Sequence, residues 1–269
     1  MRWPLAAALV FTFLAACGRG GESAQPEGVS GPGAYIALGD SLSEGVGASV
    51  QGESDFVSRV RDSLPGEFEL LNMGESGDTS FDLSGHGHLE QAAREIESRR
   101  EDDDPDNDVK LVTLEIGGND LLDIYFSRVM TGACPALEGS LAEPECVGAL
   151  RDALDGFSAN LATAIEALQD ADADADVQVI VMTLYDPFSG GLQTISELAD
   201  LALEGKKGTP FPEGLNDIIR EEAAKSGVTL VDWYPLFEGK AGEYISFDYI
   251  HPNDEGYRVM AEAVLDGVR

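Results

Sequence analysis

Residues 34–45 read AYIALGDSLSEG, an apolar run that stops at a glycine and continues into a polar corner. An apolar run of this length, bounded by a turn signal, predicts a strand that is buried on both faces. Ser41 follows this strand at the corner where the chain turns towards a helix. A serine at such a corner exposes its hydroxyl among free backbone N–H groups, which suits a nucleophile that attacks a carbonyl. Ser43 replaces the second glycine of a G-x-S-x-G nucleophile elbow, and a solvated turn serine would also fit this stretch.

Four further apolar runs follow, and helical patterns separate them. The predicted strands are residues 34–38, 68–72, 111–116, 177–184 and 228–232. The predicted helices are residues 55–64, 89–99, 147–169 and 215–225, with a last helix that Asn253 caps. Strands that alternate with helices predict an α/β fold in which helices cover both faces of a parallel sheet. Residues 34–269 show no internal repeat, and we expect them to form one domain.

Acidic residues dominate the charge of the chain. Its 269 residues include 50 acidic and 17 basic side chains, which gives a formal net charge of -33. This charge argues against nucleic acid as a partner, because the phosphate backbone would be repelled. A hydrophobic share of 43% supplies enough apolar material for a core.

The first residues have the pattern of an export signal. Arg2 supplies a positive charge, and the apolar segment that follows is too short to span a bilayer. Residues 14–18, LAACG, resemble the lipobox of bacterial lipoproteins. That resemblance implies removal of residues 1–16, lipidation of Cys17 and membrane anchoring on the periplasmic or extracellular face, whereas a plain secretory signal is the alternative. Residues 17–33 are rich in Gly, Ser, Pro and Glu and predict a flexible tether.

Two connections, residues 121–147 and residues 186–214, are longer than a compact α/β unit needs. Each begins beyond the carboxyl end of a strand, so both should overhang a ligand crevice at that edge of the sheet. The first opens with the mainly apolar residues 121–126, which either wall the crevice or complete the core. Its cysteines, Cys134 and Cys146, could form a disulfide in an exported protein or remain free thiols.

Only three histidines could serve as a base for a serine hydroxyl, namely His86, His88 and His251. His251 lies three residues after Asp248, and in a turn this spacing lets the carboxylate bind one ring nitrogen while the other faces the serine. A surface histidine near an acidic residue is the alternative interpretation. His86 and His88 could contact a metal, but no cysteine or third histidine is close in sequence, so we expect a polar loop without a metal.

Two polar segments after predicted strands offer donors for an oxyanion. Residues 72–80, NMGESGDTS, follow the second strand, and residues 117–120, GGND, follow the third. Gly77 permits a close approach to its backbone N–H, and the Asn119 amide is a neutral donor. Glycine-rich turns are common at strand ends, so each segment alone is a weak signal.

Four sequence blocks, taken in order, resemble those of the SGNH, or GDSL, hydrolase superfamily. They are GDSL at 39–42, SGDTS at 76–80, GGND at 117–120 and D-x-x-H-P at 248–252. The resemblance runs from Ala34 to the C-terminus and is closest to the branch of esterases, lysophospholipases and thioesterases. It implies a flavodoxin-like three-layer α/β/α sandwich around a five-stranded parallel sheet, with no metal or organic cofactor.

The resemblance also implies a role for each matching residue. Ser41 would be the nucleophile, His251 the general base and acid, and Asp248 the partner that orients the imidazole. The N–H groups of Ser41 and Gly77 and the side chain of Asn119 would hold the oxyanion.

Two features leave the identity of one oxyanion donor and the shape of the pocket undecided. Gly74 is a rival to Gly77 as a donor, although the SGDTS block aligns with Gly77. The insertions 121–147 and 186–214 are not shared by the smallest members of the superfamily, so the resemblance does not fix the shape of the pocket.

Together these features lead us to expect an exported, membrane-tethered serine esterase that hydrolyses carboxylic esters, with acyl lipids or lysophospholipids as substrates. A carbohydrate esterase that removes acetyl groups could use the same residues. A surface binding module that kept the fold and lost catalysis is a third alternative, from a different class of protein.

Overall fold

The computed structural model describes residues 29–134, 143–173, 176–191 and 193–269. Five parallel strands form one sheet in the order β2-β1-β3-β4-β5. The strands are β1 (Gly33–Gly39), β2 (Phe68–Gly74), β3 (Val109–Glu115), β4 (Gln178–Met182) and β5 (Thr229–Val231). The predicted five-stranded parallel sheet is confirmed, and its order is that of a flavodoxin-like fold.

The carboxyl ends of the three neighbouring strands β2, β1 and β3 align with one another. Gly39 at the end of β1 is paired with Gly74 of β2 on one side and with Glu115 of β3 on the other. The segments that follow these strands therefore leave the sheet at the same edge. Because the strand order reverses at β1, a crevice for a ligand is expected between the ends of β1 and β3.

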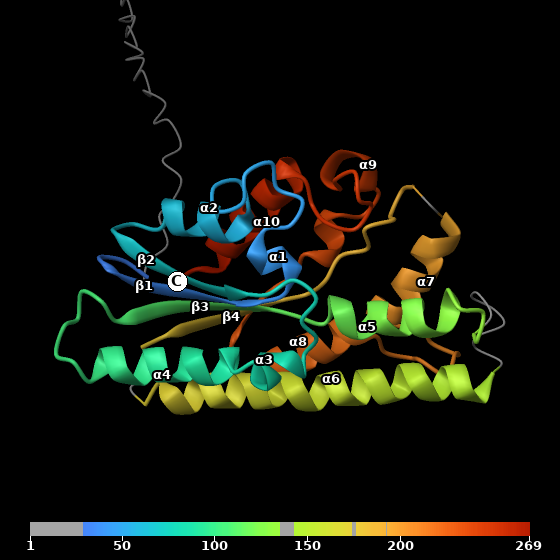
Figure 1. Ribbon diagram of the computed structural model, residues 1–269, viewed down its shortest axis with the longest axis horizontal. Coiled ribbons are helices and arrows are strands. Elements are labelled where there is room, and N and C mark those ends of the chain that lie inside the picture. The colour runs from blue at the N-terminus through green and yellow to red at the C-terminus, as the bar shows by residue number, and fades with distance from the viewer. Residues whose placement is uncertain (1–28, 135–142, 174–175, 192) are drawn as a thin grey trace, which may run out of the picture.

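Helices cover both faces of the sheet, as Figure 1 shows, which confirms the predicted three-layer sandwich. One face carries α2 (Phe56–Ser63) and α10 (Asp254–Gly267), which pack against each other. The other face carries α4 (His88–Arg100), α6 (Pro144–Ala171) and α8 (Leu215–Ser226). The short helices are α1 (Ser41–Glu44), α3 (Asp82–Gly85), α5 (Gly118–Ile124), η3 (Tyr234–Leu236) and α9 (Ala241–Tyr244).

Side-chain caps mark where two of the long helices begin. The Asp55 carboxylate accepts the Ser58 N–H at 2.8 Å and starts α2. The Asn253 side chain accepts the N–H groups of Glu255 and Gly256 and starts α10, as the sequence predicted. Each cap satisfies donors that the first turn of a helix leaves unpaired.

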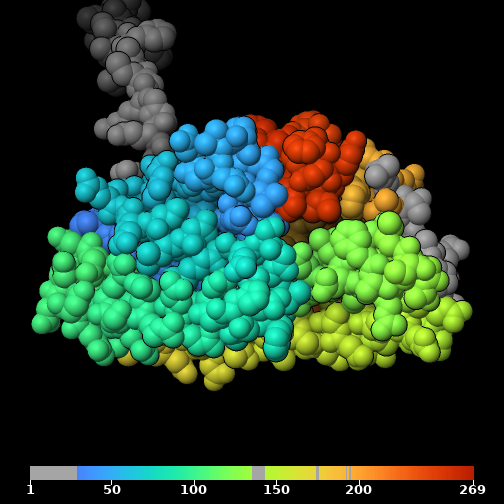
Figure 2. Space-filling model, viewed as in Figure 1, coloured from blue at the N-terminus to red at the C-terminus, as the bar shows by residue number. Residues whose placement is uncertain are grey.

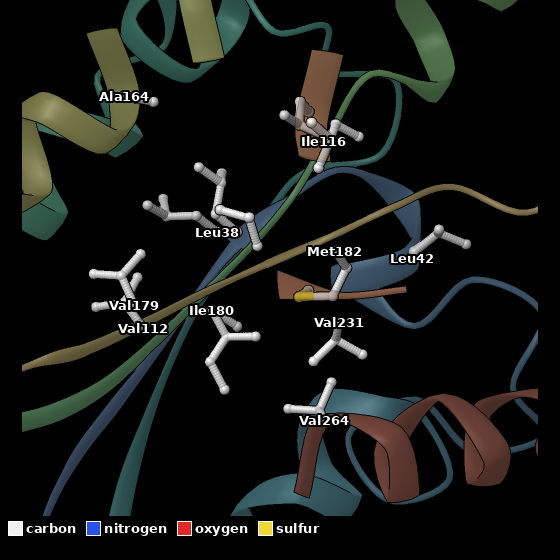
Figure 3. Close-up of a cluster of buried hydrophobic side chains, with 14 of the residues drawn as sticks. Leu38, Leu42, Val112, Ile116, Ala164, Val179, Ile180, Met182, Val231 and Val264 are labelled. Atoms are coloured by element: carbon white, nitrogen blue, oxygen red, sulfur yellow. The ribbon is translucent and has the colours of Figure 1, made fainter. Parts of the chain in front are cut away.

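Aromatic and branched side chains fill the space between the sheet and the α2–α10 layer. Trp233 is fully buried, and its ring meets the edge of Phe56 with the ring centroids 5.1 Å apart. Tyr257 of α10 stacks with Phe56, with the ring centroids 6.4 Å apart. Val231 and Val264 face one another across the same interface in Figure 3. This packing fixes α10, and with it the loop that precedes α10, against the sheet.

The described parts of both long connections lie beyond the carboxyl edge of the sheet (Figure 1). The first contains α5 and the π-helix η1 (Tyr125–Val129), and a disulfide joins its cysteines, Cys134 and Cys146. The second contains α7 (Gln193–Glu204), a helix that the sequence analysis did not predict although its apolar residues have helical spacing.

The apolar residues at the start of the first connection complete the core in part, while their role as a wall of the crevice stays a prediction. Leu121 packs against the core, whereas the side chain of Phe126 is 52% exposed. The segment therefore completes the core at its beginning and presents an apolar surface towards its end.

The end of the predicted tether is part of the domain. Val29 is buried, and its N–H donates to the carbonyl oxygen of the C-terminal residue at 2.6 Å. A tether within 17–33 therefore ends before Val29. The predicted signal peptide 1–16 and Cys17 lie outside the described residues. Within the described ranges, none of the helices has the length and apolar character needed to cross a membrane.

Candidate active site

Ser41 lies at the sharp corner between β1 and α1. Asp40 caps α1 by accepting the Leu42 N–H at 3.1 Å, which fixes Ser41 as the first residue of that helix. Gly39 precedes the corner with a φ of 155°, and a Cβ at this position would lie 2.3 Å from the Glu115 carbonyl oxygen. The close approach of β1 to β3 therefore requires glycine at position 39.

A histidine and an aspartate from the loop before α10 complete a hydrogen-bonded array with Ser41. The Ser41 hydroxyl donates to Nε2 of His251 at 2.8 Å. Nδ1 of His251 donates to Oδ2 of Asp248 at 2.7 Å. Ser41 and His251 are 210 positions apart in sequence, and the packing of α10 brings them together. In this geometry the imidazole can accept the serine proton while the carboxylate fixes its tautomer.

Backbone and side-chain donors hold the Asp248 carboxylate in its ionised form. Its Oδ1 accepts the N–H groups of Ile250 at 3.0 Å and His251 at 2.9 Å and the hydroxyl of Ser246 at 2.8 Å. Burial acts to raise the pKa of Asp248, but these hydrogen bonds and the one from the His251 ring outweigh it and lower the pKa to about 2. Asp248 is therefore a carboxylate throughout the neutral range. Ser246 was missed from sequence because its contact depends on the fold of the loop.

The loops after β2 and β3 lie against the same corner. The Asn119 amide donates to the Asp78 carbonyl oxygen at 2.8 Å and lies 3.3 Å from Oδ2 of Asp40. Gly77, just before Asp78, has a φ of 96°, and nothing lies within 4 Å of a Cβ placed there. Gly74 is a poorer donor, because its N–H is already bonded to Oδ1 of Asn72 at 3.0 Å. The Asn119 amide therefore contacts the residue that follows Gly77, and the space beside the Cα atom of Gly77 is open.

A second buried carboxyl group, Glu115, lies beneath the corner and was missed by the sequence analysis. It ends β3 with no exposed surface. Burial and the charge of neighbouring Asp40 raise the pKa of Glu115 well above its usual range. Burial also raises the pKa of Asp40, to about 6. Two carboxyl groups this close cannot both ionise cheaply, so Glu115 holds a proton at neutral pH while Asp40 caps α1.

Replacing Glu115 with glutamine is expected to stabilise the protein increasingly as the pH rises. Unfolded Glu115 loses its proton near pH ~4.3, whereas the folded state keeps it, so the free energy of unfolding of the wild type falls as pH rises above that value. The glutamine of the Glu115→Gln variant has no proton to lose. The free energy of unfolding of the variant, relative to that of the wild type, should therefore grow by up to about 1.4 kcal/mol per pH unit. Urea unfolding of both proteins between roughly pH 5 and pH 8 measures this difference. If the free energies of unfolding of the two proteins change equally with pH, Glu115 is ionised in the folded state.

A parallel sheet of this order brings a serine, a histidine and a carboxylate together at its switch point, an arrangement that suits acyl transfer. The chain belongs to the GDSL-like lipase/acylhydrolase family, whose model matches residues 37–259. This match confirms the superfamily that the sequence blocks indicated.

Three similar proteins are named lipases or acetylxylan esterases. The spore germination lipase LipC of Bacillus licheniformis is 27% identical over 237 residues, which cover 85% of this chain and 92% of the relative. The structure of the lipase Lip_vut3 from a goat rumen metagenome shares 22% identity and a TM-score of 0.62, over 87% of this chain and 96% of that one. The structure of the acetylxylan esterase Axe2 from Geobacillus stearothermophilus shares 17% identity and a TM-score of 0.55, over 89% of this chain and 95% of that one. The two structures support the fold.

Proposed function

We propose that this protein is a serine esterase that cleaves carboxylic esters of acyl lipids or lysophospholipids. The observation that carries the proposal is the continuous hydrogen-bonded array from Ser41 through His251 to Asp248. Ser41 acts as the nucleophile, His251 as general base and then general acid, and Asp248 holds the imidazole.

The reaction proceeds in two halves through an acyl-enzyme. Ser41 Oγ attacks the ester carbonyl carbon and passes its proton to Nε2 of His251. The tetrahedral intermediate collapses, the bond to the alcohol oxygen breaks, and His251 returns the proton to that oxygen. Water then attacks the acyl-serine, gives its proton to His251, and the acid leaves as Ser41 recovers its hydrogen.

Three donors around the corner stabilise the negative charge on the carbonyl oxygen. They are the N–H groups of Ser41 and Gly77 and the side chain of Asn119. Support comes from the bond between the Asn119 amide and the Asp78 carbonyl, which joins the loops after β2 and β3 beside the α1 corner. The Asn119 amide nitrogen now donates to the Asp78 carbonyl oxygen and to Oδ2 of Asp40, so one of these two bonds must break for it to donate to the oxyanion.

The distribution of exposed apolar side chains favours an acyl chain in the substrate. Six large apolar side chains are exposed within the described residues, and all six lie in segments between the carboxyl end of a strand and the next long helix. They are Val50, Phe81, Phe126, Met130, Phe247 and Tyr249. Figure 2 shows the surface hollowed where the segments after β1 (blue) and β3 (green) meet the C-terminal part of the chain (red). Apolar side chains at this edge can bind hydrocarbon that leaves water.

A fluorophosphonate probe tests the catalytic assignment directly. We expect the wild-type protein to be labelled on one serine and the Ser41→Ala variant to be unlabelled and inactive, because the probe reacts only with an activated nucleophile. Ser63→Ala removes an exposed hydroxyl at the end of α2 and serves as the control, which should label like the wild type. A wild-type protein that resists the probe would instead favour a binding module on the same fold.

A series of p-nitrophenyl esters separates an acyl-lipid esterase from a carbohydrate deacetylase, which the similarity to an acetylxylan esterase keeps as the second candidate. We expect kcat/KM to rise from the acetyl to the octanoyl ester, because each buried CH₂ contributes roughly 0.8 kcal/mol. A maximum at the acetyl ester would reject the acyl-lipid assignment and favour the deacetylase.

A further inference from the structure

The loop that carries Gly77 also gathers four ionisable side chains on its outer side. Glu75 and Asp78 come from the loop itself, His86 follows the last residue of α3, and His88 is the first residue of α4. Gly87 lies between the histidines with a φ of 82°, and this left-handed turn directs both imidazoles back towards the loop. The sequence suggested only a polar loop here, since the two carboxylates are not adjacent to the histidines along the chain.

Three of these side chains converge with the spacing of metal ligands. Nδ1 of His86 lies 2.9 Å from Oδ1 of Asp78 and 3.9 Å from Oε2 of Glu75. One ligand atom from each of the three residues lies within 4.8 Å of the others. Ligands at ~2.1 Å from a tetrahedral ion are about 3.4 Å apart, so small side-chain adjustments would bring all three into coordination.

The buried polar atoms at this place point independently to a bound cation. The Asp78 side chain is only 3% exposed, yet its Oδ2 has no hydrogen-bond partner among the described residues. Nδ1 of His88 faces that oxygen at 3.3 Å and also lacks a hydrogen bond within the described part of the chain. The other nitrogen of His88 lies 3.4 Å from Oε2 of Glu75. Leaving a buried carboxylate oxygen without a donor is costly, and a cation that both oxygens of Asp78 approach would remove that cost.

We propose that Glu75, Asp78 and His86 bind a divalent transition-metal ion of the Zn²⁺ type. His88 orients the Asp78 carboxylate from outside the ligand set, and water occupies the remaining coordination position. Imidazole combined with carboxylates favours Zn²⁺ over Ca²⁺ or Mg²⁺, which prefer oxygen ligands alone. Glu75 and His86 are about half exposed, so the ion can enter and leave from solvent.

The ion would brace the turn that presents the oxyanion donors. Gly77 immediately precedes the ligand Asp78, and the carbonyl oxygen of Asp78 accepts the amide of Asn119. Fixing Asp78 would therefore fix both Gly77 and Asn119. This link to catalysis rests on the proposed function, whereas the metal site itself does not.

Isothermal titration of the full chain with Zn²⁺ tests the site. In about 0.5 M NaCl, which screens diffuse attraction to the acidic surface, we expect one Zn²⁺ per chain and no comparable binding of Ca²⁺. His86→Gln and Glu75→Gln alter half-exposed side chains and should keep the fold while weakening Zn²⁺ binding about 100-fold. Glu90→Gln, an exposed carboxylate on α4 outside the cluster, is the matched control and should bind like the wild type. Co²⁺ absorption bands of a four-coordinate site should appear in the wild type and vanish in His86→Gln.

Two results would overturn the site. One is Zn²⁺ binding that is unchanged in His86→Gln, and the other is equal binding of Zn²⁺ and Ca²⁺, which would indicate only diffuse attraction to carboxylates. Fluorophosphonate labelling and activity distinguish the metal site itself from its proposed link to catalysis. One Zn²⁺ bound through His86 in a protein that no fluorophosphonate labels would keep the metal site and reject the catalytic proposal. Conversely, a labelled and active enzyme without stoichiometric Zn²⁺ would reject the metal site alone.

Discussion

Replacing Asp248 with asparagine is expected to lower kcat by about 10⁴-fold with little change in the fold. Asparagine keeps an Oδ1 that can accept the three donors now bound to Asp248, so the loop before α10 should persist. Its amide nitrogen, however, donates a hydrogen bond to Nδ1 of His251, whereas the carboxylate accepted a hydrogen bond from that nitrogen. The imidazole then carries its proton on Nε2, the nitrogen that must take the proton of Ser41. Steady-state hydrolysis of a soluble ester, with circular dichroism to verify folding, measures the effect.

The matched control is Asp254→Asn, which changes another aspartate close to the same loop. Asp254 accepts the N–H and hydroxyl of Ser49 and has no contact with the imidazole of His251. We expect this variant to lose some stability and keep the kcat of the wild type. Equal activity losses in the two variants would show that Asp248 acts through the structure of the loop and not through His251.

Asn119→Ala is expected to lower kcat by about 10² to 10³-fold and leave KM nearly unchanged, equivalent to roughly 3–4 kcal/mol in the activation barrier. The amide nitrogen is lost as a donor to the oxyanion, whose charge develops only as the ester carbonyl is attacked. Binding of the neutral ester depends little on that donor, so the effect should appear in kcat. Kinetics with a short-chain ester measures both constants.

The Asn119 amide also holds the Asp78 carbonyl, so a structural effect must be separated from a chemical one. Asn160→Ala is the control, since it removes an amide that donates to the Ser80 hydroxyl at 3.0 Å, on the same loop but away from the carbonyl. A similar loss of kcat in both variants, or a rise in KM alone for Asn119→Ala, would remove Asn119 from the oxyanion hole.

Local sequence patterns gave most of the secondary structure. All five strands form within about two residues of the expected bounds, because apolar runs and turn residues act over short distances along the chain. Among the long helices the exceptions are α7, whose helical spacing was present but was assigned to a long connection, and α6, which begins at Pro144. The short helices were not predicted. Proline fits the first turn of a helix, so the earlier start has a local cause that was overlooked.

The candidate catalytic residues were also accessible from sequence, but their surroundings were not. With three histidines in the chain, and one of them three residues after an aspartate, few choices remained for a base. Glu115 is an acidic residue within a predicted buried strand, and this signal was missed. A carboxyl group in such a place must either be neutral or have a partner. The packing of Glu115 against Asp40 depends on two strands that are distant in sequence.

The amino-acid sequence by itself therefore determined the strands, the Asn253 cap, the polar corner at Ser41 and the limited set of ionisable candidates, because each of these depends on neighbouring residues. The order of the strands, the contact of Ser41 with His251, the disulfide and the convergence of Glu75 and Asp78 with His86 arise only in the folded chain. Buried parallel strands have similar apolar patterns, so a pattern cannot specify which strands are neighbours. The packing of helices against both faces of the sheet specifies the neighbours, and it brings distant polar groups to a common edge.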